Sequence, residues 1–162
     1  MNKNTHIIAQ SALIAALYIV LTLISNTLGL ASGVIQIRLS EALTILPVFT
    51  PAAVPGLCVG CFISNIITGC APMDVIFGTV ATLIAAIITK HLNKHKILAS
   101  LPAIVVNTLI IPWVLALVYI FEGSVVYFTI TVFVGELISA GIIGQLLRHS
   151  LEPYADKLNI RN

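Results

Sequence analysis

Long apolar runs, interrupted only briefly by polar or proline-containing stretches, dominate this chain of 162 residues. Apolar residues make up 59% of the sequence and charged residues 9%, which leaves too few charges to cover the surface of a soluble domain. A spanning helix needs roughly 20 residues, so the chain has room for about six spans. The sequence therefore predicts an all-α integral membrane protein, in which residues 1–162 form one compact bundle of six transmembrane helices.

The six candidate spans cover residues 6–29, 40–51, 54–69, 74–91, 97–120 and 126–148. The second span is short, and three prolines fall in the segment from Pro47 to Gly56. Because proline removes a backbone donor and breaks helices, we expect a turn or a broken helix there. Irregular backbone of this kind must be covered by protein or touch water.

Basic residues orient the bundle. One side of a six-span arrangement receives Lys3, Lys90, Lys94, Lys96, Arg148, Lys157 and Arg161. The positive-inside rule places that side, with both termini, in the cytoplasm. Arg38 lies on the other side, in the segment RLSEAL and three residues before Glu41, so it needs an explanation other than topology.

Several polar side chains fall inside the predicted spans, where lipid makes them costly. A charged side chain at the bilayer centre costs about 3 kcal/mol, so such residues indicate function. Glu136 lies about ten residues into the last span, near mid-depth. The outer half of the bundle also holds Glu41, Asp74, Asn65, Asn107 and Trp113. Together they predict an outward-facing pocket for a planar ligand rich in hydrogen-bond donors, whether cationic or neutral.

Each of these residues also has a plain structural explanation. Trp113 fits an aromatic belt at the membrane surface. Asn65 and Asn107 fit hydrogen bonds between helices, and Asp74 fits a helix cap. For Glu136 a structural role would require a buried partner.

Motifs of enzymes and metal sites are missing from the sequence. It has no phosphate loop, no H-E-x-x-H pair and no G-x-S-x-G elbow. Cys58 and Cys61 have the spacing of a redox or metal pair, but no further ligands lie nearby, so we expect both to pack as small apolar residues. We therefore expect neither catalysis nor a metal or cofactor, and no hydrolysis of ATP by this chain alone.

Small residues line one face of the first span, where Ala9, Ala12 and Ala16 recur at i, i+3 and i+7. Small residues let helices approach closely in a membrane. The stripe is therefore either a docking face for another membrane protein or a packing face within the bundle.

These features resemble a known group of proteins. Six spans, the Ala12-x-x-x-Ala16 stripe and polar groups on the outer side resemble the substrate-binding S component of an energy-coupling factor (ECF) transporter. Within that group, the run IQIRLSEALTILPVFTPAAVPGL, followed by DVIFGTVATL and VVNTLI, resembles the QueT family of predicted queuosine-precursor transporters. The resemblance covers nearly the whole chain.

The resemblance implies a multi-pass subunit of an ABC-type importer in the plasma membrane of a prokaryote. Such a subunit captures its solute from outside, and the loop between its first two spans closes over the pocket. It then docks through its alanine motif, here Ala12 and Ala16, on the membrane subunit EcfT, which is carried with two ATPase subunits. The implied solute is a 7-deazaguanine such as 7-aminomethyl-7-deazaguanine, and no nucleic acid is involved.

A ligand of this class suggests a role for each polar residue. Glu136 and either Glu41 or Asp74 would accept from the guanine-like edge and the aminomethyl cation. An amide of Asn65 or Asn107 would meet the ring, and Trp113 would stack on it. Arg38 would belong to the closing loop.

Three other readings stay open at this stage. Besides a subunit for queuosine precursors, the sequence is compatible with an S component for another vitamin. It is also compatible with a stand-alone transporter that uses Glu136 as a proton-coupling carboxylate, and with an assembly subunit that has no ligand.

Overall fold

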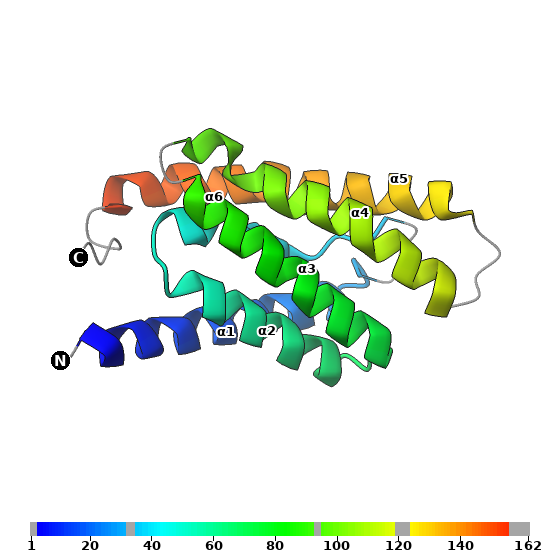
Figure 1. Cartoon of the computed structure of the whole chain (residues 1–162), viewed down its shortest axis with the longest axis horizontal. Coiled ribbons are helices and arrows are strands. Elements are labelled where there is room, and N and C mark those ends of the chain that lie inside the picture. Colours follow the sequence, from blue (N-terminus) through cyan, green and yellow to red (C-terminus); the bar gives the residue numbers. More distant parts are fainter. Residues whose placement is uncertain (1–2, 32–34, 93–94, 119–123, 156–162) are drawn as a thin grey trace.

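The computed structural model describes residues 3–31, 35–92, 95–118 and 124–155, and every regular element within them is a helix (Figure 1). Six α-helices form the frame: α1 (Lys3–Thr27), α2 (Ala53–Ile67), α3 (Pro72–His91), α4 (Leu101–Val118), α5 (Val125–Glu136) and α6 (Gly144–Leu151). Four shorter elements connect or extend them: the 3₁₀-helices η1 (Leu39–Val48), η2 (Lys96–Ser100) and η4 (Glu152–Tyr154), and the π-helix η3 (Leu137–Ile143). The prediction of an all-helical membrane bundle is confirmed at this level.

The structure does not confirm all six predicted spans. Among the described residues, four helical stretches are long and apolar enough to cross a membrane: Asn4–Thr27, Pro72–His91, Ile97–Leu117 and Val125–Tyr154. The last is continuous, because α5, η3 and α6 follow one another without a break. Lys94, Lys157, Arg161 and the final residues of the predicted span 97–120 lie outside the described ranges.

The predicted second span, 40–51, is instead the ten-residue 3₁₀-helix η1. Ten residues at a rise of about 2 Å each reach about 20 Å, short of the roughly 30 Å hydrocarbon core. The helix contains Pro47, and the chain turns between Val48 and Ala53, where a break was predicted. Most of η1 is buried among the other helices, so protein covers this irregular backbone. The predicted third span is the 15-residue α2, which is also short for a full crossing.

Glycines on α2 bring it close to α1. A Cβ on Gly56 would lie 2.8 Å from the carbonyl oxygen of Ser11, and one on Gly60 would lie 2.7 Å from the Cβ of Tyr18. The inner face of α1 therefore packs on a Gly-x-x-x-Gly pair, and Tyr18 is almost completely buried with Leu57 in the core between them.

The alanine stripe of α1 faces the other way. Ala9, Ala12 and Ala16 are exposed, so they are not a packing face of this bundle. Of the two explanations for the stripe, packing inside the bundle is therefore excluded.

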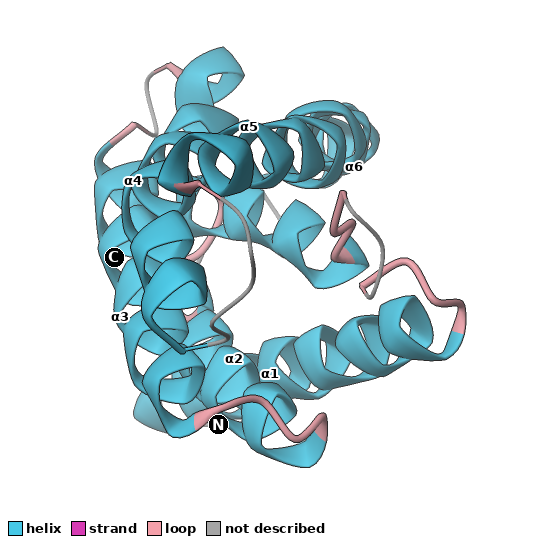
Figure 2. Ribbon diagram, turned by 90° about the vertical axis from the view of Figure 1, so that its right-hand side faces the viewer, coloured by secondary structure: helices cyan, strands magenta, loops and turns pink. Residues whose placement is uncertain are grey.

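The helices surround a common axis, as the end-on view in Figure 2 shows. The start of α1 and the end of α6 lie at the same end of the bundle (Figure 1). At the opposite end α1 and α2 stop, and each is followed by a glycine with positive φ, Gly29 at 71° and Gly69 at 73°. Only glycine adopts this conformation at low cost, so these two residues end the helices where the cavity begins.

Candidate substrate-binding site

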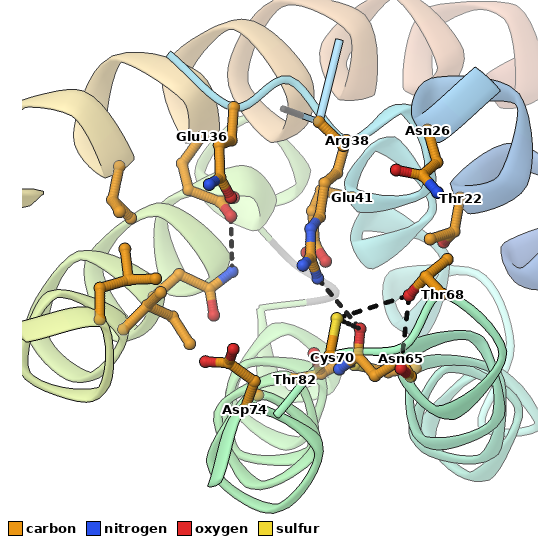
Figure 3. A pocket seen from close by; sticks show the side chains of 18 residues that line it. Thr22, Asn26, Arg38, Glu41, Asn65, Thr68, Cys70, Asp74, Thr82 and Glu136 are labelled. Carbon is orange, nitrogen blue, oxygen red and sulfur yellow. Dashed lines mark hydrogen bonds between the residues drawn. The ribbon is translucent and has the colours of Figure 1, made fainter. Parts of the chain in front are cut away.

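A polar cavity of about 260 Å³ lies inside the bundle, toward the end opposite the start of α1 (Figure 3). Its walls are stripes of residues spaced three or four apart, which is one face of each helix. The helical lining residues are Thr22 and Asn26 of α1, Cys61 and Asn65 of α2, Asp74, Gly78 and Thr82 of α3, Asn107, Ile111 and Leu115 of α4, and Val132 and Glu136 of α5. Glu41 enters from η1.

Glu41 is held by α1. Its side chain is 3% exposed, and its Oε1 accepts a hydrogen bond from the hydroxyl of Tyr18. Further along α1, the Thr22 hydroxyl donates to that of Ser40 at 2.8 Å, and Ser25 Oγ accepts the first backbone N–H of η1 at 2.8 Å. The second carboxylate oxygen of Glu41 is buried and has no hydrogen-bond partner within the described chain.

Glu136 enters the cavity from the junction of α5 and the π-helix η3. Its Oε1 accepts a hydrogen bond from the Asn107 amide nitrogen on α4 at 2.8 Å. Its Oε2 is buried and, like that of Glu41, lacks a partner among the described residues. A π-helical turn inside an α-helix often marks a functional site, because it changes the direction in which neighbouring side chains point.

Arg38 spans the cavity from the extended segment just before η1. Its backbone N–H donates to the hydroxyl of Ser139 in η3 at 3.2 Å, and its Nη1 donates to the side-chain oxygen of Asn65 on α2, also at 3.2 Å. The same segment passes so close to Gly135 that a Cβ there would overlap the carbonyl oxygen of Gln36. In Figure 3 Arg38 lies between Glu136 on one side and Asn65 on the other, and its side chain reaches toward Asn65.

The structure brings together six of the seven predicted ligand-binding residues. The cavity is lined by Arg38, Glu41, Asn65, Asp74, Asn107 and Glu136. The seventh, Trp113, does not line it, because its side chain is 60% exposed on the outside of α4. Residues 107, 111 and 115 face the cavity at intervals of four, so residue 113 points roughly away from it. The expected stacking of Trp113 on a ligand is therefore corrected, and its exposure agrees with the aromatic-belt alternative.

Sequence reasoning missed part of the site. Tyr18 supports Glu41 from α1, and Thr82 lines the wall four residues beyond Gly78. The i+4 spacing from Asp74 through Gly78 to Thr82 was a usable signal for the face of α3. For Tyr18 no such signal existed, because its role depends on how η1 packs against α1.

The chemistry of the cavity favours a ligand with several donors. Glu41 and Glu136 line the cavity, and each has one buried carboxylate oxygen without a hydrogen bond in the described parts of the chain. Leaving a buried acceptor unsatisfied costs about 1–3 kcal/mol, and more for a charged group. A bound molecule that donates to these oxygens would recover that free energy. No cluster of metal-ligating side chains occurs within the described ranges.

Comparison with known proteins places this chain in a family. A sequence profile described as "QueT transporter" matches residues 8–153. The protein named "Queuosine precursor transporter QueT" from Lactococcus lactis subsp. cremoris (strain MG1363) is 35% identical over 82 residues. That alignment covers 51% of this chain and 48% of the relative, so the matched region spans about half of each protein. No solved structure matches the chain.

The family match confirms the resemblance noted in the sequence. It also agrees with the expectation of a transporter rather than an enzyme, because the family is one of transporters. Since the profile covers most of its length, the chain belongs to the QueT transporter family.

Proposed function

We propose that this protein is the substrate-binding S subunit of an ECF-type importer for a queuosine precursor. The single observation that carries the proposal is the polar cavity inside an apolar helix bundle, in which two buried carboxylate oxygens have no partner in the described structure. Buried polar groups of this kind are costly in a membrane protein and are retained for function. The name of the Lactococcus relative supports the choice of substrate class.

The size and lining of the cavity fit a 7-deazaguanine such as 7-aminomethyl-7-deazaguanine. A volume of about 260 Å³ falls just below the range of roughly 300–1,000 Å³ that is typical of sites for drug-sized molecules, so a small fused ring is the right scale. A guanine-like edge carries adjacent N–H donors, which a carboxylate accepts in pairs. The amides of Asn65 and Asn107 supply acceptors and donors for the rest of the ring.

The exposed side of α1 supports a docking role. Ala9, Ala12 and Ala16 are exposed, and they form a shallow strip on which another helix can lie closely. The proposed partners are the membrane subunit EcfT and two ATPase subunits, which would supply the ATP hydrolysis that this chain has no motif for. With the termini in the cytoplasm of a prokaryotic cell, the cavity would open toward the outside.

Uptake into vesicles tests the proposal. The vesicles would contain this protein, EcfT and both ATPases. The labelled aminomethyl compound should accumulate only when ATP is present on the side of the membrane where the ATPases lie. The Ala12→Trp variant should bind the compound normally but lose most uptake, because the larger side chain fills the docking strip. Leu109→Trp is the matched control, since Leu109 is 65% exposed on α4 and away from the strip.

Two results would contradict the proposal. Uptake by this chain alone that a protonophore abolishes would identify a stand-alone proton-coupled transporter. Equal loss of uptake in both tryptophan variants would remove the docking role from the alanine strip.

A further inference from the structure

Charge is distributed unevenly around the cavity. Three carboxylates line it, on Glu41, Asp74 and Glu136, while Arg38 is the one Lys or Arg side chain among the lining residues of the described structure. A cavity with more carboxylates than basic groups attracts positive charge, and the attraction is strong where water is excluded. The question is which carboxylate is left for a ligand.

Glu41 and Arg38 belong to one end of the cavity. The backbone N–H of Glu41 donates to the carbonyl of Arg38 at 3.0 Å, so the two residues are one turn apart, and both side chains line the cavity. Glu41 also accepts from the buried hydroxyl of Tyr18. Arg38 in turn donates to Asn65. This end therefore contains a cation, a carboxylate, a hydroxyl and an amide, which is a mixed set suited to the edge of a heterocycle.

Glu136 has a different environment. The hydrogen bond to its Oε1 comes from Asn107, a neutral amide, and no Lys or Arg side chain donates to it in the described parts of the chain. Its Oε2 is buried and unpartnered. On α4 and α5, the neighbouring lining residues Ile111, Leu115 and Val132 are apolar. A carboxylate in such surroundings gains more from a cation than from a neutral donor.

We propose that Glu136 holds the positive charge of the ligand, while the end formed by Arg38, Glu41 and Asn65 holds the uncharged ring edge. The cavity would then select a monocationic deazapurine over a neutral one of similar shape. This assignment rests on the proposed function and adds to it the charge of the substrate and its orientation. Asn107 is a positioning residue, because it fixes one oxygen of Glu136 and leaves the other without a hydrogen bond from the described residues.

The assignment predicts a specific pattern of affinities. An ammonium group on the ligand would donate to Glu136 Oε2 in a charge-assisted bond, which a neutral substituent cannot form. Such bonds are worth enough to change a dissociation constant about tenfold or more. The gain should depend on Glu136 and not on Glu41.

Isothermal titration of the purified protein tests this with two ligands, 7-aminomethyl-7-deazaguanine and the analogue in which a neutral nitrile replaces the aminomethyl group. The unchanged protein should bind the cationic compound at least about tenfold more tightly. In Glu136→Gln the two compounds should bind about equally, because glutamine keeps the size and the bond to Asn107 but loses the charge. In Glu41→Gln both should bind more weakly while the preference for the cation remains.

The other outcomes would overturn either the assignment of Glu136 or the proposed function. Equal affinities in the unchanged protein would overturn the assignment without requiring any variant. A preference that survives in Glu136→Gln, or that disappears in Glu41→Gln instead, would also overturn it. If neither compound binds, the proposed function itself fails and the assignment fails with it. Glu136→Asp, which keeps the charge, should keep the preference for the cation, and this guards against a general loss of structure in Glu136→Gln.

Discussion

Replacing Gly60 with alanine tests the close packing of α1 on α2. Alanine is ordinarily the better residue inside a helix, by about 0.5–1 kcal/mol, because glycine loses more backbone entropy on folding. At this position, however, the added Cβ would lie 2.7 Å from the Cβ of Tyr18 and 3.1 Å from the carbonyl oxygen of Ala15. Neither atom is the flexible end of a side chain, so α1 has to move. Overpacking of this kind costs about 1–3 kcal/mol.

The net expectation for Gly60→Ala is a loss of about 0.5–2 kcal/mol in the free energy of unfolding. Gly144 of α6 provides the matched control. A Cβ there would lie 3.5 Å from the nearest atom, the carbonyl oxygen of Ala42, which is ordinary contact. Gly144→Ala should therefore stabilise the protein by up to about 1 kcal/mol, since only the entropic gain remains.

Unfolding of the purified variants in mixed detergent micelles, followed by circular dichroism during a titration with denaturing detergent, measures both effects. The two alanine variants should shift the midpoint in opposite directions. A Gly60→Ala protein as stable as the unchanged one would refute the close approach of α1 and α2 described above.

Three further predictions concern the cavity. Tyr18→Phe should weaken ligand binding and lower the free energy of unfolding by about 1–3 kcal/mol, because it leaves Glu41 without its hydroxyl donor. The control is Tyr127→Phe, because the Tyr127 side chain is 47% exposed. It should change the free energy of binding and that of unfolding by less than about 0.5 kcal/mol. Trp113→Ala should leave the dissociation constant unchanged in titration calorimetry, and a loss of affinity would mean that the indole reaches the ligand. Cys70 lines the cavity, so a bound aminomethyl compound should slow its alkylation. The rate would be measured by mass spectrometry in a variant with the other two cysteines changed to serine. An unchanged rate would place the ligand elsewhere.

The parts of the site that could be predicted from the sequence are those where lipid imposes a high cost. Arg38 was conspicuous because it breaks the positive-inside pattern, and Glu136 because it lies in the middle of an apolar run. Both line the cavity. Trp113 was misassigned because depth in the membrane was considered without helical phase. Counting in fours from Asn107 through Ile111 to Leu115 would have placed Trp113 on the opposite side of α4.

Other features depended on tertiary structure that the sequence does not state. The rule that small residues line close helix contacts fits both the alanines of α1 and the pair Gly56 and Gly60 of α2. The bundle uses the glycines, because only the absence of a Cβ admits Tyr18 at that distance. The run that contains Glu41 was predicted as a short span, yet it folds as a buried 3₁₀-helix. Two of its polar groups, the Ser40 hydroxyl and the first backbone N–H, form hydrogen bonds with side chains of the preceding helix α1.

The central claim is that the cavity holds a cationic 7-deazaguanine, and the most direct test is to identify the small molecule that co-purifies with the protein. The protein would be prepared from cells grown with 7-aminomethyl-7-deazaguanine in the medium, and its extract analysed by liquid chromatography and mass spectrometry. The account predicts that this compound is recovered from the unchanged protein and is strongly reduced in the Glu136→Gln preparation. A flavin or thiamine in its place, or equal recovery from both preparations, would contradict it.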